Sequence, residues 1–127
     1  MNLVAAGRTF FSRSGPPHPT SHLWIVLTDP DPTTTHVVIV MIVTARDHTD
    51  KTVTLPAGCH PFINRDSNVA YSTADIILAK KLESALKNGR CTLDADLNGK
   101  PFDEARAGLR VSSRTPNYVV EHCEGRF

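Results

Sequence analysis

The chain has little of what marks several large classes of protein. Its three cysteines are an odd number at long, irregular spacing, so they form no disulfide framework. A reducing compartment fits this usage, and we expect a cytoplasmic protein. The longest apolar run, Val37 to Val43, is far shorter than the ~20 residues of a membrane-spanning helix. The sequence therefore predicts no membrane partner.

Charge and recognised motifs are also sparse. The formal net charge is +1, so no overall basic field points to a nucleic acid. Aromatic residues make up only 6% of the chain, although Trp24, Phe62 and Tyr71 could provide a minimal surface for stacking bases. The sequence has no Gly-rich phosphate loop, no GxSxG or HExxH motif and no paired carboxylates at helical spacing. The histidines and cysteines lack zinc-site spacing, and we predict neither a metal nor a cofactor.

What the sequence does contain is a series of short, β-branched apolar segments separated by polar turns, followed by helical patterns. We predict strands at 23–28, 36–44, 51–55, 59–63 and 67–71, helices near 73–88 and 101–110, and a last extended segment at 118–120. Residues 1–22 are predicted to be a flexible arm, because the segment ending at Pro19 can neither pair in a sheet nor lie inside a helix. Residues 23–127 then form one mainly β domain with appended helices, built on a small curved antiparallel sheet.

The run from Val37 to Val43 lacks the alternation of a strand with one wet face. It predicts a strand covered on both faces, by the inside of the sheet and by a helix or a second subunit.

Two clusters of polar residues follow these strands. The first is Thr44, Arg46 and His48, where a guanidinium suits a phosphate and a hydroxyl suits a neighbouring oxygen. The alternative is that Arg46 and His48 are ordinary residues of a charged hairpin turn.

The second cluster is His60, Arg65, Asp66, Ser67 and Tyr71. A histidine can act as general base or acid at a ribose 2′-hydroxyl, and an arginine can stabilise charge on the phosphate. The alternative is that His60 opens a strand and that Asp66 and Ser67 form a turn that bonds its own backbone.

The order of these segments resembles the MazF/PemK (Kid-type) toxin superfamily. The resemblance is carried by Leu23-Trp24-Ile25-Val26, the Val/Ile strand ending in Thr44, the Thr52–Leu55 strand, and Ser67–Tyr71 leading into a Ser/Thr-Ala-Asp-Ile-Ile helix. It implies an SH3-like barrel, a homodimer, RNA cleavage without a metal, and inhibition by an antitoxin-like partner.

The chain departs from the family's pattern at its arginines. The family carries Arg-Pro before the second strand, where this chain has Thr34-Thr35-His36, and Thr-Ser after it, where this chain has Thr44-Ala45. It also carries Arg and Asp before the helix, where this chain has Ala70-Tyr71-Ser72.

Two hypotheses follow from this pattern. In the first, the protein cleaves or binds RNA, with His60 as general base or acid, Arg46 or Arg65 on the phosphate, and Thr44 positioning the substrate. Asp66, Ser67, Tyr71 and His48 then complete the substrate site. In the second, the same fold is a non-catalytic module that dimerises and binds a partner.

Overall fold

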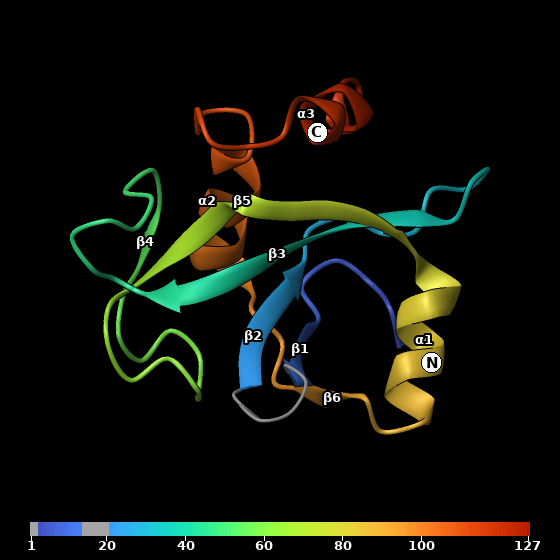
Figure 1. Cartoon of the computed structure of the whole chain (residues 1–127), viewed down its shortest axis with the longest axis horizontal. Coiled ribbons are helices and arrows are strands. Elements are labelled where there is room, and N and C mark those ends of the chain that lie inside the picture. The colour runs from blue at the N-terminus through green and yellow to red at the C-terminus, as the bar shows by residue number, and fades with distance from the viewer. Residues whose placement is uncertain (1–2, 14–20) are drawn as a thin grey trace.

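The computed structural model describes residues 3–13 and 21–127, and within them the chain forms one antiparallel sheet and three helices. Figure 1 shows the long strands β3 and β5 crossing the molecule, with β4 at one end and α1 at the other. The elements in chain order are β1 (Thr9–Arg13), β2 (Ser21–Val26), β3 (His36–Thr44), β4 (Thr54–Leu55), β5 (Ser67–Leu78), α1 (Ala79–Lys87), β6 (Cys91–Asp94), α2 (Gly99–Gly108) and α3 (Asn117–Cys123).

The six strands follow one another in the order β4-β5-β3-β2-β1-β6, and the sheet curls into a half-barrel. The mainly β, antiparallel fold with appended helices is therefore confirmed. The pairing of β3 with β5 shifts register between Ile39 and Met41. There the hydroxyl of Thr73 accepts a hydrogen bond from the Met41 amide at 3.0 Å. Such an irregularity bends a strand and increases its twist, which suits a curled sheet.

Strand β3 is buried on both faces along its first half. On one face, Val38 and Val40 join a core to which α2 and α3 contribute Ala105 and Val119. On the other face, Val37 and Ile39 pack with Ala79 and Leu82 of α1. The absence of alternation correctly predicted a doubly covered strand, and a helix supplies the second cover.

Helix α1 does not cover the second half of β3. Met41 and Val43 are only partly buried, and Thr44 is exposed. Since α1 contacts the sheet at the other end of β3, the face around Met41, Val43 and Thr44 stays open to solvent. This opening positions the candidate site.

The predicted arm at 1–22 is wrong for its middle part. Thr9–Arg13 forms β1, which lies inside the sheet between β2 and β6, and Phe10 is buried. Residues 9–13 form a strand because they pair with β2 on one edge and with β6 on the other. These pairings cannot be recognised in a single sequence. Residues 14–20, which carry the prolines used in the prediction, lie outside the described part of the chain.

The predicted helix at 73–88 is wrong in its first part, because β5 continues to Leu78. Residues 75–78 pair with the start of β3, from His36 to Ile39, so tertiary pairing outweighs the helical spacing of Ile76 and Ala79. The second helix is shifted to 99–108, residues 59–63 form turns, and residues 118–120 lie inside α3. Of the predicted 51–55 strand, only Thr54–Leu55 pairs.

No helix in the described ranges is both long and apolar enough to cross a membrane.

Candidate functional site

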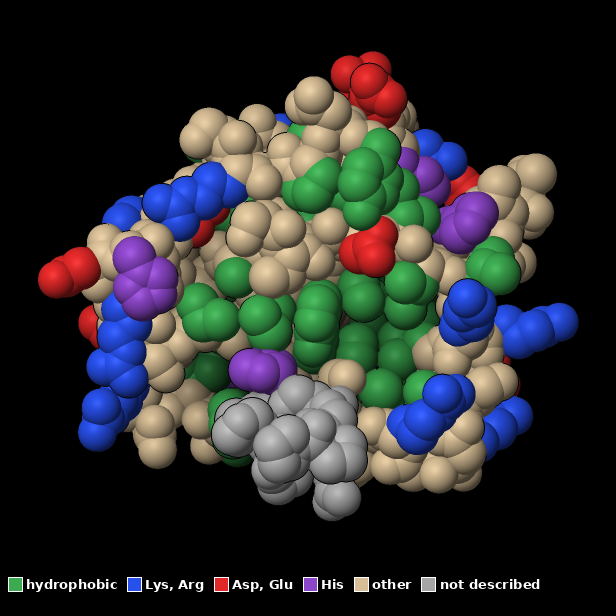
Figure 2. Space-filling model, viewed as in Figure 1, with side chains coloured by type: hydrophobic (Ala, Val, Ile, Leu, Met, Phe, Trp, Pro, Cys, Tyr) green, Lys and Arg blue, Asp and Glu red, His purple; other side chains and the backbone are tan. Residues whose placement is uncertain are grey.

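A groove of about 590 Å³ opens on the uncovered face of the sheet where β3 ends, and we call it the Thr44 groove. Its floor is apolar and comes from β2, β3 and β5, while its rim carries cationic side chains. Figure 2 shows this face, with hydrophobic side chains across its middle and Lys, Arg and His side chains at the left edge. The lining residues are His22, Leu23, Met41, Ile42, Val43, Thr44, Arg46, His48, Thr49, Asp50, Phe62, Ala70, Ser72, Thr73 and Arg114.

The turn after β3 holds Arg46 and His48 at the rim of the groove. The hydroxyl of Thr49 accepts a hydrogen bond from the Arg46 amide at 2.9 Å and lies 2.7 Å from Oδ1 of the buried Asn68. The turn is thereby tied to β5, and the Arg46 and His48 side chains remain exposed. The three predicted residues Thr44, Arg46 and His48 all line this groove, and their role toward a substrate stays a prediction.

A further guanidinium enters the groove from the far end of the chain. Arg114 lies between α2 and α3, and its Nη1 donates to the His48 carbonyl oxygen at 3.0 Å. The sequence pattern did not single out Arg114. Its spatial neighbours are 66 residues away in the chain, so no local signal pointed to them.

Asp50 is the one carboxylate that the described residues contribute to the lining of this groove. It is buried, and it accepts hydrogen bonds from the Thr52 amide and from the hydroxyls of Thr52 and Ser112. Burial by itself raises the pKa of Asp50, but these hydrogen bonds and the charge of Arg114 outweigh it and lower the pKa. The carboxylate is therefore charged at neutral pH, and both of its oxygens accept hydrogen bonds from the protein.

A second opening of about 290 Å³ adjoins the first, and we call it the Arg65 hollow. Leu23, Ile42, Val43, Thr44 and Phe62 line both openings. Arg65 belongs to the second, so cationic groups stand on both sides of Thr44 and Phe62.

Phe62 is the aromatic side chain shared by the two openings. Phe62 is 51% exposed, and its ring lies edge to face with that of Phe11, with the ring centroids 4.7 Å apart. An exposed ring held in this way can accept a stacked base.

His60 lies in neither opening, which goes against its predicted role as a catalytic base or acid. Its side chain is only 2% exposed. The Phe62 amide donates to Nδ1 at 3.0 Å, and Nε2 lies 2.7 Å from the Ala95 carbonyl oxygen and 3.1 Å from the Thr9 hydroxyl. These partners favour the tautomer with its proton on Nε2. Both ring nitrogens are occupied, so His60 joins the 59–63 turns to β1 and to the segment after β6.

The other predicted substrate residues also have structural partners. Tyr71 is fully buried, its hydroxyl donates to the Ala105 carbonyl oxygen at 2.6 Å, and burial raises its pKa. Asp66 is exposed outside both openings and accepts from the Ala57 amide. Ser67 lines the Arg65 hollow, but it is buried and donates to the Arg65 carbonyl oxygen.

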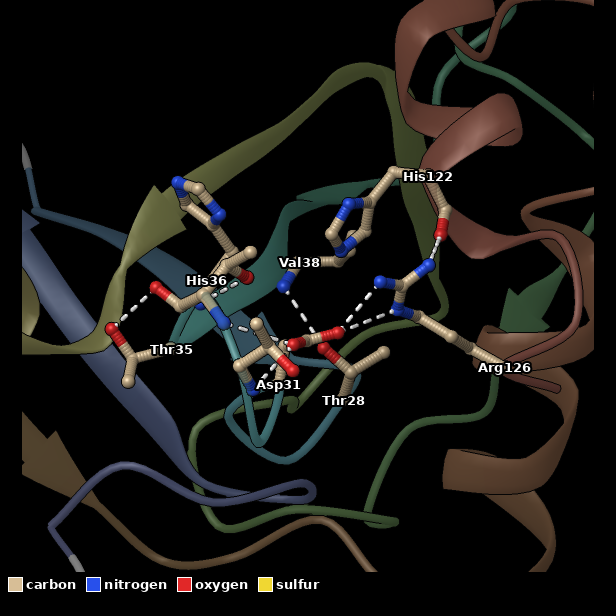
Figure 3. Close-up of polar contacts among 9 residues, drawn as sticks. Thr28, Asp31, Thr35, His36, Val38, His122 and Arg126 are labelled. Atoms are coloured by element: carbon tan, nitrogen blue, oxygen red, sulfur yellow. Dashed lines mark hydrogen bonds and ion pairs between the residues drawn. The ribbon is translucent and has the colours of Figure 1, made fainter.

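A separate cluster joins the C-terminal segment to the loop between β2 and β3 (Figure 3). Asp31 pairs with Arg126 at 2.6 Å, and hydrogen bonds from Thr34, Arg126 and Thr33 lower the pKa of Asp31. The rings of His36 and His122 stand edge to face beside this pair, 6.2 Å apart. They border a cavity of about 320 Å³. Because the charges here are mutually paired, we interpret this cluster as a structural clasp.

The three cysteines are unpaired. Within residues 3–13 and 21–127, no group of three or more His, Cys, Asp or Glu side chains is placed to hold a metal ion.

No protein-family model matches the chain. No curated protein sequence is significantly similar to it either.

Proposed function

We propose that this protein binds RNA in the Thr44 groove and the adjoining Arg65 hollow. The observation that carries the proposal is the arrangement of Arg46, Arg114 and Arg65 around Thr44 and the exposed ring of Phe62. Guanidinium groups bind phosphate oxygens through paired N–H donors, and an exposed aromatic ring supplies a surface for a base.

The local charge supports this proposal where the net charge of the chain does not. Three arginines face one carboxylate in the two linings, and that carboxylate, on Asp50, is already bonded to Ser112 and Thr52. A phosphate entering the groove therefore meets an excess of positive over negative charge. A groove with an excess of one charge attracts a ligand of the opposite charge even when the whole molecule is close to neutral.

Cleavage is the second candidate function, and the observation that favours it is that His22 and His48 both line the Thr44 groove. In a metal-free reaction, an imidazole removes the proton of a ribose 2′-hydroxyl. The 2′-oxygen then attacks the adjacent phosphorus, and the bond to the 5′-oxygen breaks as that oxygen takes up a proton. His48 is the exposed member of the pair and is our choice for the base. It replaces the buried His60 in that role.

A relation to the MazF/PemK superfamily is part of the proposal. Strands β2, β3 and β5 contain segments that carried the resemblance, and the sheet is curled. The Ser/Thr-Ala-Asp-Ile-Ile segment, expected to open a helix, instead lies in β5, so this part of the match is wrong. A homodimer and an antitoxin-like partner belong to the same proposal. The non-catalytic module stays the alternative if RNA does not bind.

The test measures binding of a fluorescent, mixed-sequence single-stranded RNA in EDTA. We expect Arg46→Ala to weaken binding about tenfold, the low end of what a charged hydrogen bond contributes. Arg90→Ala is the matched control, because Arg90 is an exposed arginine outside both openings, and it should bind as the wild type does. A folded wild type that does not bind the RNA would overturn the proposal.

The same mixtures, resolved on a denaturing gel, test cleavage. We expect cleavage by the wild type and none by His48→Ala. Binding without any cleavage would leave an RNA-binding protein and remove the nuclease.

A further inference from the structure

We infer that Arg114 is a substrate contact of the Thr44 groove, and that Asp50 is a positioning residue that holds it there through the Ser112 hydroxyl. This inference rests on the proposed RNA-binding function. It adds a group from the C-terminal third of the chain to a site otherwise built at the end of β3.

The contact between the two parts of the chain is a buried hydrogen bond. The Ser112 hydroxyl donates to Oδ2 of Asp50 at 2.5 Å, across 62 positions of sequence, and both residues are buried. The other oxygen of Asp50 accepts from the Thr52 amide and hydroxyl at 3.0 and 2.6 Å. The carboxylate is therefore held by the β3–β4 connection and offers one fixed acceptor to Ser112.

Ser112 in turn fixes the position of the Arg114 backbone. Because its hydroxyl proton is directed at Asp50, its oxygen lone pairs face other donors, and the Arg114 amide donates to that oxygen at 3.1 Å. The segment is anchored from the other side by the Ser112 amide, which donates to the Gly108 carbonyl oxygen at 2.9 Å. The backbone of Arg114 is thus fixed relative to both α2 and the β3–β4 connection.

The side chain of Arg114 then reaches the groove rim. Its Nη1 donates to the His48 carbonyl oxygen at 3.0 Å, which leaves most of the five guanidinium donors without a hydrogen bond to the described residues. The Arg114 side chain is exposed and lines the groove, as Arg46 does. Two guanidinium groups from distant parts of the chain therefore border one opening, an arrangement that suits a phosphodiester backbone.

The alternative is that Asp50 and Ser112 only fasten the C-terminal segment to the sheet. A fastening role changes stability, whereas a positioning role also changes how strongly Arg114 interacts with RNA. Coupling between Ser112 and Arg114 in RNA affinity separates the two roles.

The experiment measures RNA affinity in EDTA over a range of salt for Arg114→Ala, Ser112→Ala, the double variant and Ser112→Thr. We expect Arg114→Ala to weaken binding about tenfold and to reduce the salt slope by about 0.7, the value for one lost phosphate contact on a single strand. Ser112→Ala should weaken binding several-fold, and the double variant should bind no more weakly than Arg114→Ala. Ser112→Thr, which keeps the hydroxyl, should restore the wild-type affinity.

Each contrary result has a distinct meaning. If Arg46→Ala weakens binding and Arg114→Ala does not, the inference is overturned and the proposed function stands. If Ser112→Ala, shown to be folded by its unfolding midpoint, binds as the wild type does, the positioning role is overturned. If the wild type does not bind RNA, the proposed function is overturned and the inference falls with it.

Discussion

Replacing His60 with alanine should destabilise the folded protein without removing a group that acts on RNA. The ring is almost completely buried, and its removal leaves the Phe62 amide without its acceptor at Nδ1. It also removes the contact of Nε2 with the Ala95 carbonyl oxygen. Emptying a buried side-chain site costs about 2–5 kcal/mol, and each lost hydrogen bond costs about 1 kcal/mol more. We expect the free energy of unfolding of His60→Ala to fall by about 4 kcal/mol.

Urea denaturation measures this loss. With an m-value of about 2 kcal/mol/M, a loss of about 4 kcal/mol lowers the midpoint by about 2 M. His48→Ala is the control, because His48 is exposed, and its free energy of unfolding should stay within about 0.5 kcal/mol of the wild-type value. A His60→Ala protein with the wild-type midpoint that no longer cleaves RNA would refute this reasoning and return His60 to the site.

Three further predictions concern stability. Gly108→Ala should destabilise the protein by about 2 kcal/mol in urea, because the added Cβ would lie 2.2 Å from the Tyr71 hydroxyl, and this overpacking outweighs a gain of about 1 kcal/mol in helix propensity. Thr115→Val should raise the free energy of unfolding by about 1 kcal/mol, because the buried Thr115 hydroxyl has no hydrogen-bond partner among the residues that the structure describes, and an unchanged or lower free energy would contradict this. Burial and the charge of Arg126 lower the pKa of His122 below its ordinary 6.5, so the unfolded chain binds this proton more readily and stability falls as the pH drops through 6.5 towards the folded pKa. The midpoint of His122→Gln should therefore decrease less than that of the wild type between about pH 7 and pH 5, and equal decreases would count against the assignment.

Features that depend on neighbouring residues could be predicted from the sequence alone. The β-branched run from His36 to Thr44 predicted β3 with its observed bounds, and its lack of alternation predicted burial on both faces. The first polar cluster was predicted for the same reason, because a strand end and the turn that follows it necessarily keep Thr44, Arg46 and His48 together.

Features that depend on partners distant in the chain could be seen only in the folded protein. The helical spacing after Tyr71 was overruled because β3 offers a pairing partner to Asp75 and the residues after it. His60 is a residue type that often acts in catalysis. In the folded protein, however, its Nε2 contacts the Thr9 hydroxyl and the Ala95 carbonyl oxygen, which belong to distant parts of the chain. Arg114 is the opposite case, an unremarkable arginine that Ser112 and Asp50 fasten to the rim of the groove. The same explanation holds for all three features. The role of a side chain depends on the groups that surround it, and contacts between distant parts of the chain determine which groups these are.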